Sequence, residues 1–106
     1  MTDKIVVLST CDSEEQAAQI GRHLVERRLA ACVNILPGAR SIYRWKEKIE
    51  DAPEFMLVIK SRRDLFGTLC AEIEKLHSYE SPEVIALQIV DGSENYLGWL
   101  DRELGS

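Results

Sequence analysis

The chain has 106 residues, of which 45% are hydrophobic, so it is long enough to bury one core, and we expect a single domain over residues 1–106. Its net charge of -5 argues against a nucleic-acid partner, because a polyanion would be repelled. Its longest apolar runs, residues 29–33 and 55–59, are far shorter than the roughly 20 residues that span a bilayer, which argues against a membrane segment.

The first predicted elements are a strand over residues 5–11 and a helix that begins near Asp12. The strand is apolar and β-branched, and overlapping capping boxes follow it, Asp12 with Glu15 and Ser13 with Gln16. Helical spacing then predicts one apolar face that packs on a sheet, made of Ala17, Ile20, Gly21, Leu24 and Val25.

The next element is one very long strand. Residues 29–36 are apolar, Pro37-Gly38 indicates a bulge, and alternation continues through residues 41–46. We expect the charged residues 46–51 and Pro53 to form the turn, and residues 55–60 to return as the hairpin partner. Strands usually run about 3 to 10 residues, so the far end predicts a partner outside the protomer, and a second copy of the chain is the simplest candidate.

The second half of the chain repeats the pattern of the first. It predicts a helix over residues 64–76, a polar loop over 76–83, a strand over 84–90 and a last helix capped by residues 91–94. The order β-α-β-β-α-β is typical of an α+β, ferredoxin-like split βαβ sandwich, with helices on one face of an antiparallel sheet. We therefore predict that fold, with a long bent β-hairpin and an extra C-terminal helix.

The cysteines and the start of the chain bear on the compartment. Cys11, Cys32 and Cys70 have the spacing of neither a disulfide framework nor a zinc motif, so we expect reduced thiols, with Cys32 and Cys70 in the core. The first four residues lead directly into a strand-like stretch with no cleavage site, which predicts no secretory signal. Both observations favour a cytoplasmic protein.

Four groups of residues match a known family in the same order: Arg28 to Ile35, Pro37-Gly38 with Ser41 to Lys46, His77 to Glu80 with Pro82 to Val84, and Tyr96 to Leu100. Over nearly the whole length, the chain resembles the CutA divalent-cation tolerance proteins. The resemblance implies a homotrimer that assembles through the long hairpin, similar in architecture to the PII signalling proteins. It also implies that divalent ions bind, copper above all, but it brings no settled biochemical mechanism.

Three positions depart from the family pattern. Gln88 stands where a proline is common in the last strand, which restores a backbone donor there. Glu47 stands where a glycine commonly follows the Trp-Lys pair, which predicts a locally altered hairpin turn. Ser9 stands where some members have a cysteine that has been proposed as a copper ligand. A serine hydroxyl is a poor ligand for copper, so that role does not transfer to this chain.

Cys11 and His77 are the candidate metal ligands. Cys11 ends a strand just before a helix N-terminus, where the helix dipole and free backbone donors favour a thiolate. His77 lies in the loop where the family resemblance places a histidine, with Tyr79, Glu80 and Glu83 nearby in sequence. The alternatives are a half-buried thiol and a histidine that interacts only with a helix C-terminus. We expect Cu(II) or another divalent cation, without tight binding, because no two histidines have the i, i+4 spacing of a helical site.

Tyr43 and Trp45 are candidates for a cleft between subunits. They alternate onto the same face of the long strand, beyond the reach of the helices, and aromatic side chains are enriched at interfaces. Tyr79, Glu80 and Pro82 are expected to line the same cleft, or alternatively only to shape their loop.

Two functions are compatible with these features. The first is a homotrimeric copper-tolerance protein that binds divalent ions and is not an enzyme. The second is a PII-like module whose intersubunit clefts bind a small molecule or a partner protein. The chain has no Ser-His-Asp order and no glycine-rich phosphate loop. Acylphosphatases share its size and fold, so hydrolysis of small phosphates is the enzymatic alternative, by fold analogy alone.

Overall fold

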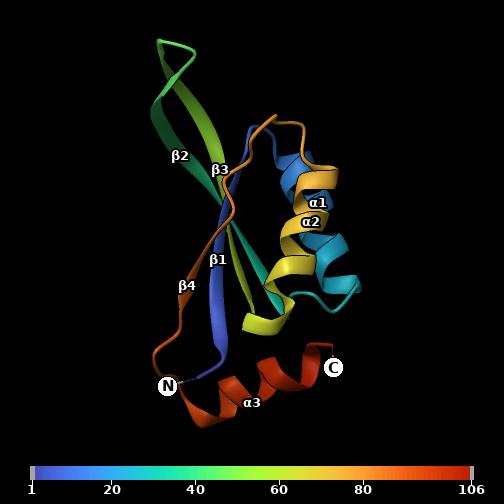
Figure 1. Ribbon diagram of the computed structural model, residues 1–106. Helices are drawn as coiled ribbons and strands as arrows, with labels where there is room; N and C mark the ends of the chain where they lie inside the picture. The colour runs from blue at the N-terminus through green and yellow to red at the C-terminus, as the bar shows by residue number, and fades with distance from the viewer. Residues whose placement is uncertain (1, 106) are drawn as a thin grey trace.

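The computed structural model describes residues 2–105 and has the predicted order of elements. These are β1 (Lys4–Cys11), α1 (Glu14–Glu26), β2 (Cys32–Trp45), β3 (Lys48–Arg62), a 3-10 turn (Arg63–Leu65), α2 (Phe66–Leu76), β4 (Ile85–Gln88) and α3 (Glu94–Glu103). The sheet has the order β2-β3-β1-β4 and every pairing is antiparallel. Helices α1 and α2 lie side by side on one face, and α3 lies at the end of the sheet away from the hairpin tip (Figure 1). The predicted ferredoxin-like fold is confirmed.

Helix α1 forms and packs largely as its sequence indicates. The Ser13 hydroxyl caps it by accepting a hydrogen bond from the backbone N–H of Gln16 at 3.1 Å. Its buried face consists of Ala17, Ile20, Gly21 and Leu24. The prediction for Val25 was wrong, since this side chain is 41% exposed. One residue advances a helix by about 100°, so the residue after Leu24 turns away from the sheet.

The bend in the long strand is a β-bulge, as Pro37-Gly38 predicted. Leu36 pairs with Met56 and Ala39 pairs with Glu54, so two residues of β2 lie opposite one residue of β3. Gly38 has a φ of 86°, which a residue without a Cβ adopts easily. Beyond this bulge the β2–β3 hairpin extends past the helices (Figure 1).

The turn of the hairpin lies within the charged run but is much shorter than predicted. Trp45 pairs with Lys48, so the loop is Lys46 and Glu47 alone, and Pro53 lies inside β3 opposite Arg40. A proline is tolerated there because β1 pairs only with residues 55–62 of β3, which leaves the other edge of β3 unpaired at Pro53.

The geometry of this turn predicts how Glu47, which departs from the family pattern, affects the stability of the fold. Lys46 and Glu47 both have positive φ angles, 50° and 68°, the combination that two-residue hairpin turns require and that favours Asn-Gly. We expect Glu47→Gly to stabilise the fold by about 1 kcal/mol, because glycine adopts this conformation without steric cost. The midpoint of urea unfolding measures the change. Lys48→Gly, which puts glycine into the adjacent strand, is the control and should destabilise; an equal loss in Glu47→Gly would contradict the prediction.

The hydrophobic core lies between the sheet and helices α1 and α2. Its fully buried side chains include Val7, Cys11, Ile20, Leu24, Leu57, Ile59, Leu69 and Ile73. Cys32 and Cys70 were expected in this core, but both are only half-buried. In the part of the chain that the structure describes, no helix is long and apolar enough to cross a membrane.

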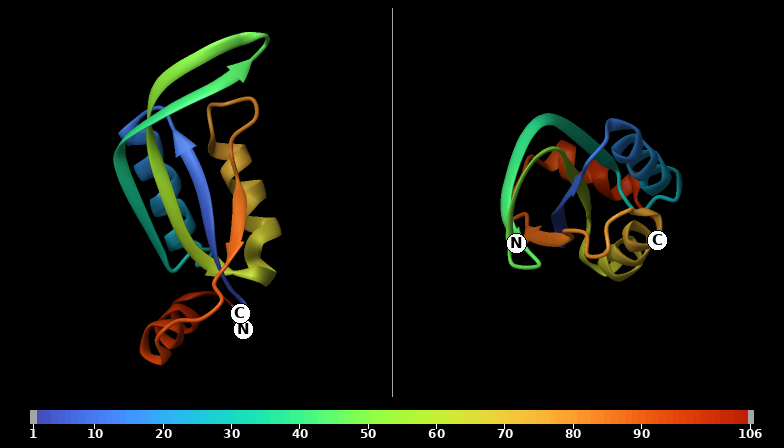
Figure 2. Two further views of the ribbon diagram at one scale, coloured as in Figure 1. Left: turned by 90° about the vertical axis from the view of Figure 1, so that its left-hand side faces the viewer. Right: turned by 90° about the horizontal axis from the view of Figure 1, so that it is seen from above.

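The opposite face of the sheet has no helix in front of it (Figure 2, left). We call it the open face. Side chains alternate along the strands, so the neighbours of the core residues point to this side. Its apolar side chains include Val6 and Leu8 of β1, Met56 and Val58 of β3, and Ile85 and Leu87 of β4. The same register places Lys60 opposite Val6 and Thr10 opposite Met56 on this face. Ile85 and Leu87 are 50% and 53% exposed.

Candidate functional site

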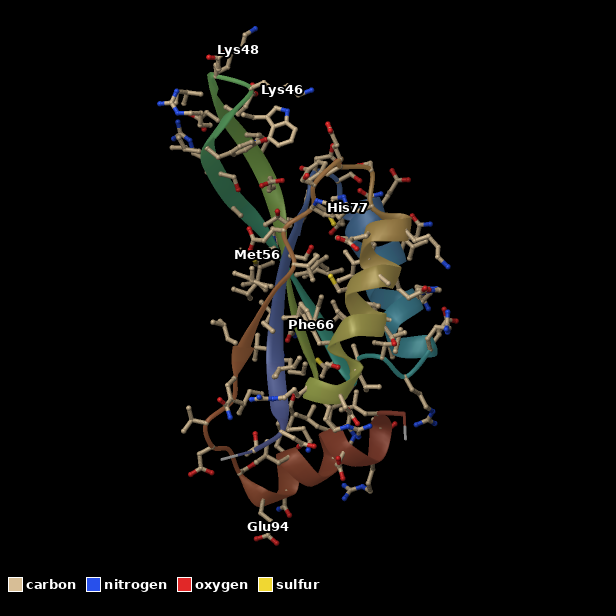
Figure 3. The ribbon with its side chains drawn as sticks, in the orientation of Figure 1. Lys46, Lys48, Met56, Phe66, His77 and Glu94 are labelled. Carbon is tan, nitrogen blue, oxygen red and sulfur yellow. The ribbon has the colours of Figure 1, made fainter. Side chains whose placement is uncertain are left out.

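The two predicted metal ligands lie next to each other. Cys11 is the last residue of β1, and His77 follows the last turn of α2. The Cys11 Sγ lies 3.7 Å from the His77 Nε2, although the residues are 66 positions apart in the sequence. Figure 3 labels His77 where the end of α2 meets the top of the sheet. The fold thus brings together a sulfur and an imidazole that no local motif connects.

Both ring nitrogens of His77 are occupied by backbone groups. Nε2 lies 2.7 Å from the carbonyl oxygen of Thr10, and Nδ1 lies 3.1 Å from the backbone nitrogen of Tyr79. A carbonyl only accepts and an N–H only donates, so Nε2 carries the proton and Nδ1 accepts. The ring is 8% exposed and packs against the Tyr79 ring at 4.5 Å. His77 therefore holds its loop to the end of β1.

Of the two interpretations that the sequence left open for Cys11, burial favours the thiol over the thiolate. Burial raises its pKa to about 11, and the charges of Asp12 and Glu54 add to the effect. The proton would have to leave before the sulfur could bind a metal ion. Within residues 2–105 there is no group of three or more His, Cys, Asp or Glu side chains arranged to hold a metal. Cys11 and His77 thus supply two protein donors.

A groove opens beside this pair, between the hairpin and the loop after α2. It has a volume of about 560 Å³. Four of the five residues predicted for a cleft line it: Tyr43, Trp45, Tyr79 and Glu80. Pro82 is half-buried and is not among the lining residues. We call this feature the hairpin groove.

The sequence alone did not indicate the residue at the base of the hairpin groove, Glu54. This side chain is only 5% exposed, and its Oε2 accepts a hydrogen bond from the Tyr79 hydroxyl. Burial and the Glu54 carboxylate both raise the pKa of that hydroxyl. In the sequence, Glu54 stands out only because it is acidic and lies two residues before Met56, and therefore on the same face of the strand as Met56 and Val58. It becomes informative only when the bulge and the strand register are known.

Ser9 is fully buried on the helix-facing side of β1. Its hydroxyl has no hydrogen-bond partner within the described residues. The Ser9 hydroxyl therefore makes no hydrogen bond to either candidate metal ligand, Cys11 or His77.

Comparison with known proteins places these features in a family. The family described as CutA1 divalent ion tolerance protein matches residues 5–103. The divalent-cation tolerance protein CutA of Thermus thermophilus is 46% identical over 94% of this chain and 97% of its own length. The chloroplastic protein CutA of Arabidopsis thaliana is 43% identical over 91% of this chain, which spans about half (53%) of that longer protein. The crystal structure of CutA from Xylella fastidiosa is 41% identical, covers 98% of this chain and 100% of its own, and gives a TM-score of 0.95.

Proposed function

This chain belongs to the CutA1 divalent ion tolerance protein family, and from that premise we propose that it is a homotrimer that binds Cu(II) or a related divalent ion weakly at Cys11 and His77. The observation that carries the proposal is the 3.7 Å approach of the Cys11 sulfur to the His77 ring nitrogen. Sulfur and imidazole together suit copper and zinc better than magnesium or calcium. We further propose that it acts by binding and not by catalysis, in the cytoplasm, where its thiols stay reduced.

The chemistry of the pair argues for weak and pH-dependent binding. An ion at Nε2 has to displace the proton that this nitrogen donates to the Thr10 carbonyl at 2.7 Å. The ring then carries its proton on Nδ1, which loses the hydrogen bond from the Tyr79 N–H. An ion at Sγ has to displace a proton whose pKa is raised to about 11. Both steps oppose binding at neutral pH, so no tightly held ion is expected.

Two features of the fold support the homotrimer. The open face presents apolar side chains that a monomer would leave in water, and large exposed apolar patches mark interaction sites. The hairpin tip also exposes Ile42 and Ile49, at 64% and 61%. The molecule measures 44 × 24 × 22 Å along its principal axes, because the hairpin extends past the core. A second copy of the chain is the economical partner for both surfaces. The proposal of three copies per assembly comes from the family resemblance.

Calorimetric titration of the reduced protein with Cu(II) and Zn(II) tests the metal site. We expect saturation near one ion per chain. Zn(II) binding should tighten by about tenfold per pH unit between about pH 7 and pH 8, because binding releases the Cys11 proton and Zn(II) does not oxidise thiols. The sign follows from the raised pKa of about 11: throughout this range the thiol is protonated in the free protein and must be deprotonated in the complex.

Matched variants make this test specific. Cys11→Ser should lose the pH dependence, whereas Cys70→Ser, which removes a thiol from the middle of α2, should retain it. His77→Gln is preferred to alanine for binding studies because its amide can still donate to the Thr10 carbonyl. An unchanged isotherm in the double variant of Cys11→Ser and His77→Gln would show that the ion binds elsewhere.

We propose a second role at the hairpin groove, as a PII-like module that binds a small molecule or a partner protein between subunits. The observation that favours it is the groove itself, whose volume of about 560 Å³ falls in the range of known ligand pockets. Its aromatic lining, Tyr43, Trp45 and Tyr79, provides large contact surfaces at little entropic cost. This role does not depend on the Cys11 and His77 pair.

A further inference from the structure

We propose that the ligand of the hairpin groove is an aliphatic amine, preferably a diamine, which binds through ammonium groups. This inference rests on the second proposed function and names its ligand class. The groove is lined by the hairpin beyond the bulge, by the end of β1 at Thr10, and by residues 79–81 and 83 of the loop after α2. Figure 3 shows the hairpin tip, with Lys46 and Lys48, projecting beside the loop that begins at His77.

The charges of the groove select for a cation. Three carboxylates line it, Glu54, Glu80 and Glu83, and none of the lining residues within the described chain is basic. The Tyr79 hydroxyl donates to only one oxygen of Glu54, Oε2, so the other oxygen is available to accept a hydrogen bond from a ligand. An anionic ligand such as a nucleotide or a carboxylic acid would be repelled by these three carboxylates, and only the exposed Lys46 beside Glu80 offsets them.

An ammonium group of the chain itself already occupies one end of this arrangement. The Lys46 Nζ lies 5.7 Å from the centre of the Trp45 ring and 3.9 Å from the Glu80 Oε2. Trp45 and Glu80 both line the groove. The site thus combines an aromatic face with a carboxylate, the pairing that recognises alkylammonium ions. The Lys46 and Glu80 side chains are each 73% exposed, so the contact is weak and a ligand can displace it.

The same lining argues against a bare metal ion as the ligand of this groove. Tyr43, Trp45 and Ile42 contribute aromatic and aliphatic surface that contacts carbon and not a hydrated ion. Within residues 2–105 no set of three or more acidic, histidine or cysteine side chains converges on one point. An aliphatic amine uses both parts of the lining, since its methylene groups pack on the rings and its ammonium groups bind the carboxylates.

The test uses three probes of equal length and different charge: diaminopentane, pentanediol and glutarate. Each is titrated calorimetrically into the purified full-length protein at constant ionic strength, with a chelator present to remove divalent ions. We expect a saturable isotherm for diaminopentane alone. Glu80→Gln should weaken it by about two- to fivefold, the usual contribution of an exposed ion pair, whereas Glu103→Gln at the end of α3 should leave it unchanged.

Lys46→Met provides an independent test, because it removes the ammonium that competes with the ligand. We expect diaminopentane to bind about two- to fivefold more tightly, as loss of a competing cation–π contact implies. Lys48→Met removes the same charge from the neighbouring position and should change affinity less than twofold. An equal gain in affinity in both variants would overturn the competition argument. It would show that the net charge of the hairpin tip, and not displacement of Lys46, controls binding.

The outcomes separate this inference from the function on which it rests. If pentanediol binds as tightly as diaminopentane, the amine assignment is wrong while the groove remains a binding site. If none of the three binds, and no neutral or anionic metabolite stabilises the protein in a thermal-shift screen, both proposals are wrong. Metal binding at Cys11 and His77 is unaffected by either result, because the chelator excludes it from the test.

Discussion

Leu87→Glu is expected to convert the proposed trimer into monomers. Leu87 lies on the edge strand β4, is paired with Val6 of β1 and is 53% exposed in a single chain. In an assembly through the open face it would be buried against another copy, and an unpaired buried carboxylate costs about 3–5 kcal/mol. Closed symmetry repeats this cost in every subunit. Light scattering at micromolar concentration should show the mass fall from about three times 12.0 kDa to 12.0 kDa.

Val25→Glu is the matched control for Leu87→Glu. Val25 is also an exposed aliphatic side chain, at 41%, but it lies on α1 in the layer that covers the other face of the sheet. The control should stay trimeric. A wild-type protein that scatters as a monomer would refute the assembly outright, and a trimer that survives Leu87→Glu would place the interface on another surface.

His77→Ala is expected to destabilise the protein by about 3 kcal/mol, whether or not metal is bound. The substitution removes the partners of two backbone groups, the Thr10 carbonyl and the Tyr79 N–H. Each buried group left without a partner costs about 1–3 kcal/mol, and the lost ring also leaves a cavity beside Cys11. Urea unfolding at a fixed protein concentration, with a chelator present, measures this loss.

His77→Gln separates the hydrogen bonds from the imidazole chemistry. Its amide can donate to the Thr10 carbonyl as the ring nitrogen does, so we expect it to recover more than half of the stability lost in the alanine variant. Equal destabilisation in both variants would contradict the hydrogen-bond explanation. A wild-type and a His77→Ala protein of equal stability would show that His77 has no structural role.

The structural role of His77 changes how a loss of metal tolerance should be interpreted. A residue that joins the end of β1 to the loop after α2 affects the hairpin groove as well, because Thr10 and Tyr79 line it. A His77→Ala variant that loses function is therefore compatible with a damaged groove and with a lost ligand. Only variants that preserve the fold, such as His77→Gln and Cys11→Ser, distinguish the two.

Local chemistry in the sequence determined most of the fold. Helical spacing around Ala17, Ile20 and Leu24 specified a helix that packs on a sheet, and Pro37-Gly38 specified the bulge. The order of the elements then left the ferredoxin-like arrangement as the economical solution. The predicted hairpin turn was too long, because charge and Pro53 are weaker signals than strand register, which depends on all pairs along β2 and β3.

The chemistry of the candidate sites was decided by contacts between distant segments. The sequence indicated Cys11 and His77 separately as candidate ligands. Only the packing of distant segments placed them 3.7 Å apart, buried the thiol and gave both ring nitrogens backbone hydrogen-bond partners. Burial opposes charge on the Cys11 sulfur, and the structure therefore favours the thiol, which the sequence had left as one of two alternatives. Glu54 likewise gained its importance from the strand register that sets it against Tyr79. Periodicity and capping act within a few residues and can be read from the sequence, whereas pKa values and hydrogen-bond partners depend on which distant residues the tertiary structure brings together.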